Sequence, residues 1–463
     1  MLDKNKVGED MGEFFGTDGI RGVANAQLTP ELAFRLGVAA GVVLSQQTRD
    51  EHVTNKVLIG KDSRLSSDML ENALAAGFMS VGVDVVKLGL IPTPGVSYLT
   101  THYTAMAGAM ISASHNPYYD NGIKIFNGQG EKLPEAVEEQ IEQYLSDEQM
   151  YRQLPRPTHE GVGRCYDDTE GLQIYSEHLV STIRSRSFAN YRIVLDCANG
   201  SASALAPDIF RSLGAQVISL SDKPNGTNIN VECGSTHIEA LREQVLLTEA
   251  DLGLAFDGDA DRLIAVDHLG NIIDGDFVLA VCGQDLQERG QLKDNTIVTT
   301  VMANIGFFAG VERLAIQTVK TKVGDKYVLE EMLEHGYVLG GEQSGHIIFL
   351  EYGKTGDGIL TGLQLTDLLV RKQKTLAQAC EIMRKFPQLL VNVAVNNKEA
   401  LTDNQVIQLA IRENEQKLGE LGRVLVRPSG TEPLVRVMAE GPDEAQLEEI
   451  VNQLVDIVKR ELA

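Results

Sequence analysis

The sequence predicts an α/β protein in which three similar α/β domains with mixed sheets precede a smaller α+β domain at the C-terminal end. Two observations support this prediction. Short β-rich runs alternate with helical segments through most of the chain, which is typical of βαβ units whose sheet is buried between helices. After Pro387 the order changes to strand, helix, strand, strand, helix, which is typical of a small α+β unit. At about 150 residues per domain, the 463 residues provide three domains or four small ones.

Domain boundaries are expected where Pro, Gly and charged residues cluster, as they do in segment 152–164. Domain 1 is therefore placed over residues 1–163. Its predicted elements are strands at 56–60, 83–89 and 107–114 and a helix over 66–82. Ser66 or Ser67 is the expected N-cap of that helix, because a serine hydroxyl can accept from the first free backbone N–H groups.

Domains 2, 3 and 4 are expected over 164–268, 269–385 and 386–463. The last helix, over 443–462, is amphipathic, with acids early and bases late as the helix dipole favours. The other predicted elements are strands at 192–197, 215–221, 295–301, 315–321, 337–342 and 388–396, helices near 203–213, 325–335 and 404–418, and two strands within 423–441.

Composition argues against several classes of function. With 41 basic and 65 acidic residues the net charge is −24, which disfavours nucleic acid as a partner but permits small anionic substrates. The chain start has no apolar signal region, and the apolar stretch 36–44 is too short to cross a bilayer. Five scattered cysteines without a CxxC pair indicate reduced thiols. We therefore expect a cytoplasmic protein without a membrane partner, and its oligomeric state stays open.

The strongest local signal is the segment LAFDGDADRLIAV, in which Asp257, Asp259 and Asp261 follow an apolar strand. Carboxylates at i, i+2 and i+4 can converge only if the small residues between them let the loop curl tightly. Convergence without a cation would be costly, because like charges repel. A hard divalent cation removes that cost, and Mg²⁺ is the expected ion.

This loop has two alternative interpretations. An EF-hand is excluded because its sixth position would be Arg262 instead of Gly and its twelfth His268 instead of Glu. A solvated Asp-Gly turn between two strands remains open on local spacing alone.

A second signal is GAMISASHNPYYDNGIKIF, where a strand ends in a small polar loop around Ser114. Open α/β sheets place ligands at this edge, so Ser114 is a candidate nucleophile or phosphate carrier, with His115 and Lys124 as candidate partners. In isolation the segment is equally compatible with an ordinary turn and a solvated lysine. No GxSxG elbow occurs, which argues against acyl transfer.

Two further loops contain groups that suit a phosphosugar. In RPSGTEPLVR, Arg427 and Arg436 flank hydroxyls and a glycine, and forked arginine donors match a phosphate; a polar hairpin turn in water is the alternative. In GGEQSGH, Glu342 and Ser344 offer an acceptor and a donor of the kind that sugar hydroxyls need. His346 is either a ligand contact or a structural histidine.

Five segments together resemble the α-D-phosphohexomutase superfamily in order along nearly the whole chain. The segments are FGTDGIRG, ISASHNPYYDNGIK, DGDADR, GEQSGH and RPSGTEP. The resemblance implies four domains around a central cleft, with one loop from each domain. Ala260 stands where glycine is more usual in that superfamily; we expect the alanine to be tolerated, because its methyl group fits if φ is negative.

The resemblance also implies a role for each matching residue. Ser114 would be the phosphoserine, Lys124 the acid/base, and Arg262 a catalytic cation beside the metal. One Mg²⁺ per chain would be held by the Ser114 phosphate with Asp257, Asp259 and Asp261. The substrate-binding residues would be Glu342 and Ser344 for sugar hydroxyls and Arg427, Ser429, Gly430 and Thr431 for the substrate phosphate.

The segment KVGDKYV and Gln343 resemble the glucosamine branch of the superfamily. The implied reaction interconverts glucosamine 6-phosphate and glucosamine 1-phosphate through a 1,6-bisphosphate and feeds UDP-N-acetylglucosamine and peptidoglycan-precursor synthesis. The alternative within the family is a phosphoglucomutase/phosphomannomutase. Two alternatives from other classes are a non-catalytic phosphosugar-binding protein and a Mg²⁺-dependent phosphatase.

Overall fold

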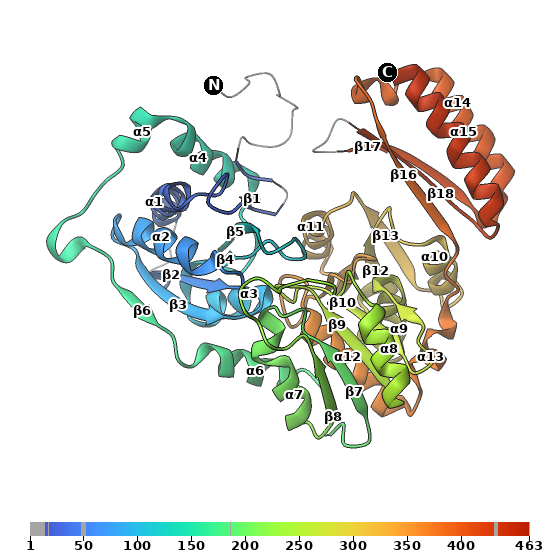
Figure 1. Cartoon of the computed structure of the whole chain (residues 1–463), viewed down its shortest axis with the longest axis horizontal. Coiled ribbons are helices and arrows are strands. Elements are labelled where there is room, and N and C mark those ends of the chain that lie inside the picture. The colour runs from blue at the N-terminus through green and yellow to red at the C-terminus, as the bar shows by residue number, and fades with distance from the viewer. Residues whose placement is uncertain (1–13, 17, 48–51, 186, 430–433, 463) are drawn as a thin grey trace. The chain divides into compact units, whose positions relative to one another are not determined.

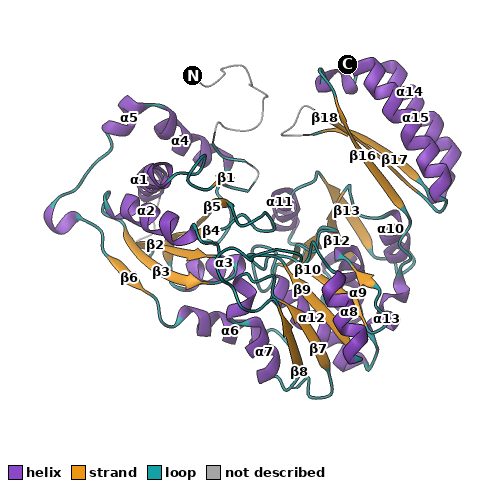
Figure 2. Cartoon of the chain, viewed as in Figure 1, coloured by secondary structure: helices purple, strands orange, loops and turns teal. Residues whose placement is uncertain are grey.

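The chain, seen in a computed structural model, is described over residues 14–16, 18–47, 52–185, 187–429 and 434–462. It divides into two compact units (Figures 1 and 2). Unit 1 contains the residues up to Val301 together with Thr318–Cys380, and unit 2 contains Met302–Gln317 together with Glu381–Ala463.

The first sheet of unit 1 is mixed, with strand order β1-β5-β4-β2-β3-β6. Strands β1, β5 and β4 pair antiparallel, and β4, β2, β3 and β6 pair parallel. The strands are β1 (Ile20–Val23), β2 (Thr54–Lys61), β3 (Asp84–Leu90), β4 (Ala105–Ile111), β5 (Asp120–Asn127) and β6 (Cys165–Asp167). The accompanying helices are α1 (Pro30–Gln47), α2 (Ser67–Met79), α3 (Thr93–His102), α4 (Glu135–Ser146), α5 (Glu148–Arg152) and α6 (Gly171–Ser181).

Two more sheets follow in unit 1, with strand orders β11-β10-β9-β7-β8 and β13-β12-β14-β15. The strands are β7 (Arg192–Asp196), β8 (Gln216–Leu220), β9 (Leu252–Phe256), β10 (Leu263–Asp267), β11 (Ile272–Ile273), β12 (Thr296–Thr300), β13 (Gln317–Thr321), β14 (Leu339–Gly341) and β15 (Ile347–Phe349). The helices are α7 (Ala206–Ser212), α8 (Glu239–Thr248), α9 (Gly275–Glu288), α11 (Asp325–His335), α12 (Gly358–Lys372) and α13 (Leu376–Ala379).

The three sheets repeat one topology, as the sequence predicts. In each, the first strand lies between the second and the third, and the third pairs antiparallel with the fourth. The three sets are β2, β3, β4 and β5; β7, β8, β9 and β10; and β12, β13, β14 and β15. The turn between the third and fourth strands therefore has the same place in every repeat. These three turns contain Ser114, the aspartate triplet and Glu342 respectively.

Alternate residues of a strand point to opposite faces, and β2 shows the consequence. Val57 and Ile59 pack into the core that contains α1 and α2, while Leu58 packs into a second core with α3. Helices α1 and α2 approach closely because Gly77 has no side chain at their contact. A Cβ at this position would lie only 2.2 Å from the carbonyl oxygen of Phe34. Both faces of the sheet are thus covered, which explains why β4 is apolar throughout.

The predicted N-cap position of α2 is confirmed, but the expected capping hydrogen bond is not formed. Ser66 is the N-cap residue. Its hydroxyl instead accepts from Nδ2 of Asn121 at 2.9 Å, so a tertiary contact replaces the local one. The apolar stretch 36–44 lies within α1, and all of its residues are buried.

Unit 2 contains an antiparallel sheet with strand order β16-β18-β17. Its order of strand, helix, strand, strand, helix is the predicted one, and helices α14 and α15 contribute to a single apolar core with the sheet. The elements are α10 (Ile305–Glu312), β16 (Gln388–Ala394), α14 (Gln405–Leu418), β17 (Arg423–Pro428), β18 (Leu434–Glu440) and α15 (Glu444–Leu462).

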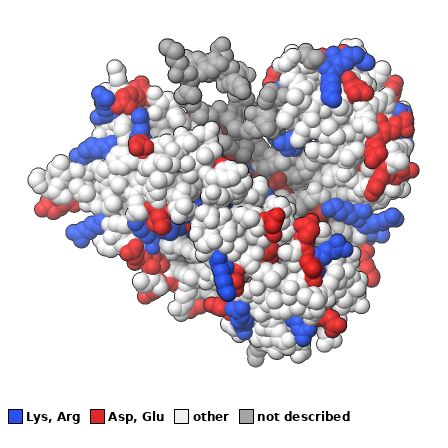
Figure 3. Space-filling view, in the orientation of Figure 1, with Lys and Arg blue, Asp and Glu red and all other residues white. Residues whose placement is uncertain are grey.

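The predicted domain boundaries stay predictions, and two details bear on them. Strand β6 begins after residue 163 yet pairs with β3 of the first sheet. Residues 302–317 join unit 2. All five cysteines are free, and none of the helices in the described ranges has the length and apolar character needed to cross a bilayer. On the face shown in Figure 3, acidic and basic side chains are interspersed.

Candidate active site

Ser114 lies in the turn between β4 and β5 and has a positive φ of 52°. A positive φ is strained for a residue with a side chain, so the surroundings must hold the turn in place. Arg64 Nη2 and Asn230 Nδ2 each donate to the Ser114 carbonyl oxygen at 2.8 Å. Ser112 Oγ accepts from the Ser114 backbone N–H at 2.9 Å. These contacts hold the Ser114 backbone in place and do not involve its hydroxyl, which can therefore take part in the chemistry of the site.

Arg64 is the anchor of this turn. Its guanidinium also donates to the carbonyl oxygens of Asn116, Pro117 and Asp120, and its Nε pairs with Asp62 Oδ2 at 2.8 Å. Both members of the Arg64–Asp62 pair have fully buried side chains. A guanidinium can satisfy so many carbonyl groups because it has five donors in one plane.

The aspartate triplet converges as the sequence predicts. Carboxylate oxygens of Asp257, Asp259 and Asp261 all lie within 4.8 Å of one another and are buried. Ser114 Oγ donates to Asp257 Oδ2 at 2.6 Å, so the serine and the triplet share one site. Burial, and then the charges of Asp261 and Asp259, raise the pKa of Asp257 well above its ordinary value.

The donor set fits a hard divalent cation. Oδ1 of Asp259 and Oδ1 of Asp261 are buried and have no hydrogen-bond partner among the described residues. Buried carboxylate oxygens without partners are costly, and a cation with oxygen ligands such as Mg²⁺ would satisfy them. The structure therefore supports a metal site at the triplet.

The expectation of a negative φ at Ala260 is wrong. Its φ is +56°, because the loop turns tightly enough for Ala260 N to donate to the Asp257 carbonyl oxygen at 3.1 Å. The left-handed conformation costs an alanine roughly 1 kcal/mol relative to glycine, which the surrounding contacts offset. The alanine is fully buried, and Gly358 N donates to its carbonyl oxygen at 2.9 Å.

Lys124 lies on β5 and reaches the same loop. Its Nζ is 2.8 Å from Asp259 Oδ2, 3.7 Å from Asp261 Oδ2 and 3.0 Å from Asp18 Oδ2. Burial alone would lower the pKa of Lys124, but the three carboxylates outweigh it and raise the pKa above the ordinary value. Lys124 is therefore a cation that contacts the metal loop.

His115 and Arg262 complete the surroundings of Ser114. His115 Nδ1 is 3.2 Å from Ser114 Oγ, and burial together with Arg262 and Arg21 lowers the pKa of His115 to about 4. The imidazole is therefore neutral at physiological pH. Arg262 N donates to Asp257 Oδ1 at 3.2 Å, and its Nε, 3.7 Å from Asp261 Oδ1, makes no hydrogen bond to a described residue.

The predicted sugar loop follows β14 and touches the metal loop through His346. Its Nδ1 is 3.5 Å from Asp261 Oδ2, and its Nε2 accepts from Gly356 N at 2.9 Å. Glu342 Oε1 accepts from Gly324 N at 3.1 Å. Ser344 Oγ is buried without a hydrogen-bond partner in the described part of the chain, so it is available to a ligand.

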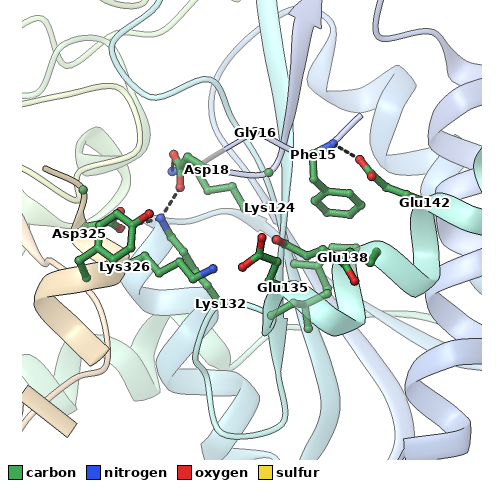
Figure 4. Close-up of a pocket in the computed structure, with 16 residues that line it drawn as sticks. Phe15, Gly16, Asp18, Lys124, Lys132, Glu135, Glu138, Glu142, Asp325 and Lys326 are labelled. Atoms are coloured by element: carbon green, nitrogen blue, oxygen red, sulfur yellow. Dashed lines mark hydrogen bonds and ion pairs between the residues drawn. The ribbon is translucent and has the colours of Figure 1, made fainter. Parts of the chain in front are cut away.

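A cavity of about 410 Å³ adjoins these groups (Figure 4). Asp18, Lys124 and Lys132 line it beside Asp325, and glutamates of α4 line it as well. Lys132 Nζ bridges Asp18 Oδ1 at 2.7 Å and Asp325 Oδ2 at 2.6 Å. The cavity therefore connects elements of the first and third sheets beside Lys124.

Unit 2 contains the predicted phosphate loop. Arg427 and Arg436 are paired across β17 and β18, and burial with the neighbouring Arg436 charge lowers the pKa of Arg427. Two adjacent cations favour an anion between or beside them. Ser429 Oγ is buried and, like Arg427 Nε, has no hydrogen-bond partner among the described residues. The other two predicted phosphate ligands, Gly430 and Thr431, lie outside the described residues.

Family models match the chain in four consecutive parts. They describe the phosphoglucomutase/phosphomannomutase alpha/beta/alpha domains I, II and III over residues 12–152, 173–270 and 274–386, and the C-terminal domain over 390–457. The chain belongs to the phosphoglucomutase/phosphomannomutase family.

Relatives within the phosphoglucomutase/phosphomannomutase family cover nearly the whole chain. The phosphoglucosamine mutase of Brevibacillus brevis is 57% identical over 452 residues, which are 98% of this chain and 100% of the relative. A solved family protein from Burkholderia thailandensis has a TM-score of 0.80 at 24% identity and covers 96% of this chain and 98% of its own. The N-acetylphosphoglucosamine mutase of Aspergillus fumigatus, solved with GlcNAc-6P and magnesium, has a TM-score of 0.69 at 17% identity and coverages of 97% and 96%. These two structures have the same fold as this chain.

The sequence motifs do not predict the contacts that Asp18, Arg64 and Asn230 make in the site. Arg64 follows β2, as Ser114 follows β4 and Asp257 follows β9, so its position after a strand is the signal that was available. Asp18 lies within FGTDGIRG, a segment that carries the resemblance but does not by itself indicate a role for the aspartate. Asn230 lies in a long polar loop, and nothing in its local sequence indicates its contact with Ser114.

Proposed function

We propose that this protein is a phosphoglucosamine mutase, which interconverts glucosamine 6-phosphate and glucosamine 1-phosphate. The observation that carries the proposal is the contact between the Ser114 hydroxyl and the buried aspartate triplet. Relatives of that name, 50–57% identical over nearly the whole chain, support the choice of sugar. The product would supply UDP-N-acetylglucosamine synthesis in the cytoplasm.

The phosphoryl group would be carried on Ser114. In the first half-reaction, the bond between Ser114 Oγ and phosphorus breaks and a bond from phosphorus to the sugar O1 forms, giving glucosamine 1,6-bisphosphate. In the second, the bisphosphate is bound in the opposite sense, its 6-phosphoryl group returns to Ser114 Oγ, and glucosamine 1-phosphate leaves. The fixed backbone of the serine turn would hold the oxygen in line with the phosphorus.

Each half-reaction also moves one proton from the attacking hydroxyl to the departing oxygen. We assign this transfer to Lys124, whose ammonium form is favoured by Asp18 and Asp259. The ammonium would protonate the departing oxygen, and the amine so formed would take the proton of the attacking hydroxyl. No net proton is then gained or lost.

A divalent cation would be held by Asp257, Asp259, Asp261 and the phosphate on Ser114. When bound, Mg²⁺ would neutralise negative charge on the group in transit. Arg262 would add a second positive charge beside the loop. Glu342 and Ser344 would bind sugar hydroxyls, and Arg427, Ser429, Gly430 and Thr431 would bind the phosphate that is not reacting.

A direct test compares the rates on glucosamine 1-phosphate, glucose 1-phosphate and mannose 1-phosphate, each with a catalytic amount of the matching 1,6-bisphosphate. The proposal expects the highest kcat/KM on the glucosamine compound. A higher value on glucose or mannose phosphate would favour a phosphoglucomutase/phosphomannomutase instead. Stoichiometric release of inorganic phosphate in place of the isomer would identify a phosphatase.

A further inference from the structure

Glucosamine phosphates differ from glucose phosphates in one ionic feature, the amine at C2, which is a cation near neutral pH. A site that prefers the amino sugar therefore gains from a carboxylate beside the sugar-binding loop. The carboxylates that line the cavity are those of Asp18, Asp325 and four glutamates of α4, and among these described residues only Asp325 forms an ion pair with the sugar-binding loop.

Asp325 is tied to the sugar loop at two points. It is the first residue of α11 and directly follows Gly324, whose N–H donates to Glu342 Oε1 at 3.1 Å. Its own Oδ2 is 3.6 Å from Nε2 of His346, at the other end of the loop. Asp325 also lines the cavity that contains Lys124 (Figure 4). The carboxylate thus lies beside the groups proposed to bind the sugar hydroxyls.

Asp325 Oδ1, the second carboxylate oxygen, is available to bind a ligand. Lys132 Nζ at 2.6 Å and His346 Nε2 at 3.6 Å both contact Oδ2, and Oδ1 forms no hydrogen bond or ion pair with a residue in the described ranges. The side chain is 22% exposed, so a ligand in the cavity can reach it. Burial alone would raise the pKa of Asp325, but Lys132 and His346 lower it below the ordinary value, so the group is ionised.

The other carboxylates near the cavity suit an amine less well. Asp18 already pairs with Arg21, Lys124 and Lys132. Glu142 Oε1 accepts from the backbone N–H groups of Phe14 and Phe15. The aspartate triplet belongs to the metal site.

We propose that Asp325 binds the C2 ammonium of the amino sugar through Oδ1 and so makes the enzyme prefer glucosamine phosphate to glucose phosphate. The inference rests on the proposed function and adds the residue that selects the substrate. An ion-paired hydrogen bond of this kind accounts for a preference of roughly 10- to 100-fold.

The test uses the full-length enzyme with Asp325→Asn and the matched control Glu243→Gln, which removes a carboxylate from an exposed position of α8 that does not line the cavity. KM and kcat are measured with glucosamine 1-phosphate and with glucose 1-phosphate. We expect Asp325→Asn to reduce kcat/KM for glucosamine 1-phosphate about 10- to 100-fold, mainly through KM, and to change the glucose value less than about threefold. Glu243→Gln should leave both values unchanged.

An equal loss on both sugars would overturn the proposal, since it would indicate a structural role through Lys132. If Asp325→Asn does not fold, Asp325→Glu replaces it: a retained preference for the amine supports the proposal, and its disappearance overturns it. A wild-type preference for glucose phosphate would contradict both the proposed function and this inference. Wild-type preference for glucosamine phosphate that survives in Asp325→Asn would remove only the role of Asp325.

Discussion

Ser114 Oγ donates a 2.6 Å hydrogen bond to Asp257 Oδ2 across 143 positions of sequence. The two residues lie in equivalent turns of two repeated sheets, one after β4 and the other after β9. The repeat therefore explains how a hydroxyl and a carboxylate cluster from separate domains come to share one site.

Replacing Ser114 by Ala removes the proposed phosphoryl carrier. We expect isomer formation to fall by about 1,000-fold or more, because no other described hydroxyl makes the same contact with Asp257. Thermal unfolding should change little, since the hydroxyl contributes nothing to the apolar core. Full turnover of sugar phosphate by Ser114→Ala would refute the mutase mechanism.

Asp259→Asn should reduce kcat by about 100-fold or more while the fold persists. The carboxylate supplies an unpartnered buried oxygen to the proposed metal site and accepts from Lys124 and Thr93. The measurement is kcat as a function of Mg²⁺ concentration, with circular dichroism as the check on folding. An unchanged rate at saturating Mg²⁺ would contradict the assigned metal site.

Arg64→Ala should reduce stability and activity together. Removing one member of a buried ion pair costs roughly 3–5 kcal/mol, because Asp62 would be left as an uncompensated buried charge. The Ser114 turn would also lose its main anchor, so kcat should drop by about 100-fold. Urea unfolding and steady-state rates measure the two effects.

The exposed Arg211, which pairs with Asp208 on the surface, provides the control for Arg64. Arg211→Ala should change the free energy of unfolding by less than about 1 kcal/mol and leave kcat unaffected. Equal effects of the two substitutions would show that the buried network has no special role.

Glu138→Gln should stabilise the protein at alkaline pH. Burial raises the pKa of Glu138 from 4.5 to about 7. The charges of Glu142 and Glu135 add to this increase, and those of Lys326 and Lys132 oppose it. The folded state thus binds the proton more tightly, and the stability that this provides below pH 4.5 is lost as the pH rises through about 7. Allowing for partial exposure to water, the variant should gain about 1 kcal/mol at about pH 8 relative to wild type.

The measurement is the free energy of unfolding of the variant and of wild type between about pH 5 and about pH 8. Glu139→Gln removes a charge from an exposed position of the same helix and serves as the control. A difference between Glu138→Gln and wild type that stays constant across this range would contradict burial as its cause.

The fold and the loops of unit 1 could be predicted because each motif is contiguous and follows an apolar strand. Ser114 and Asp257 are predicted as site residues for this reason. The anchors could not be predicted from the same reasoning: Arg64 acts by hydrogen bonds to backbone carbonyl groups, and Asn230 reaches Ser114 from a loop of another domain. The φ of Ala260 was mispredicted because local composition does not determine how tightly a loop must turn.

The central claim is that Ser114 carries a phosphoryl group beside the aspartate triplet. Intact-mass measurement of the purified protein, before and after incubation with glucosamine 1,6-bisphosphate and Mg²⁺, tests it most directly. The account predicts a mass increase of one phosphoryl group, located at Ser114 by peptide fragmentation and absent from Ser114→Ala. A protein that never acquires this mass, or that acquires it at another residue while still converting the sugar, would contradict the account.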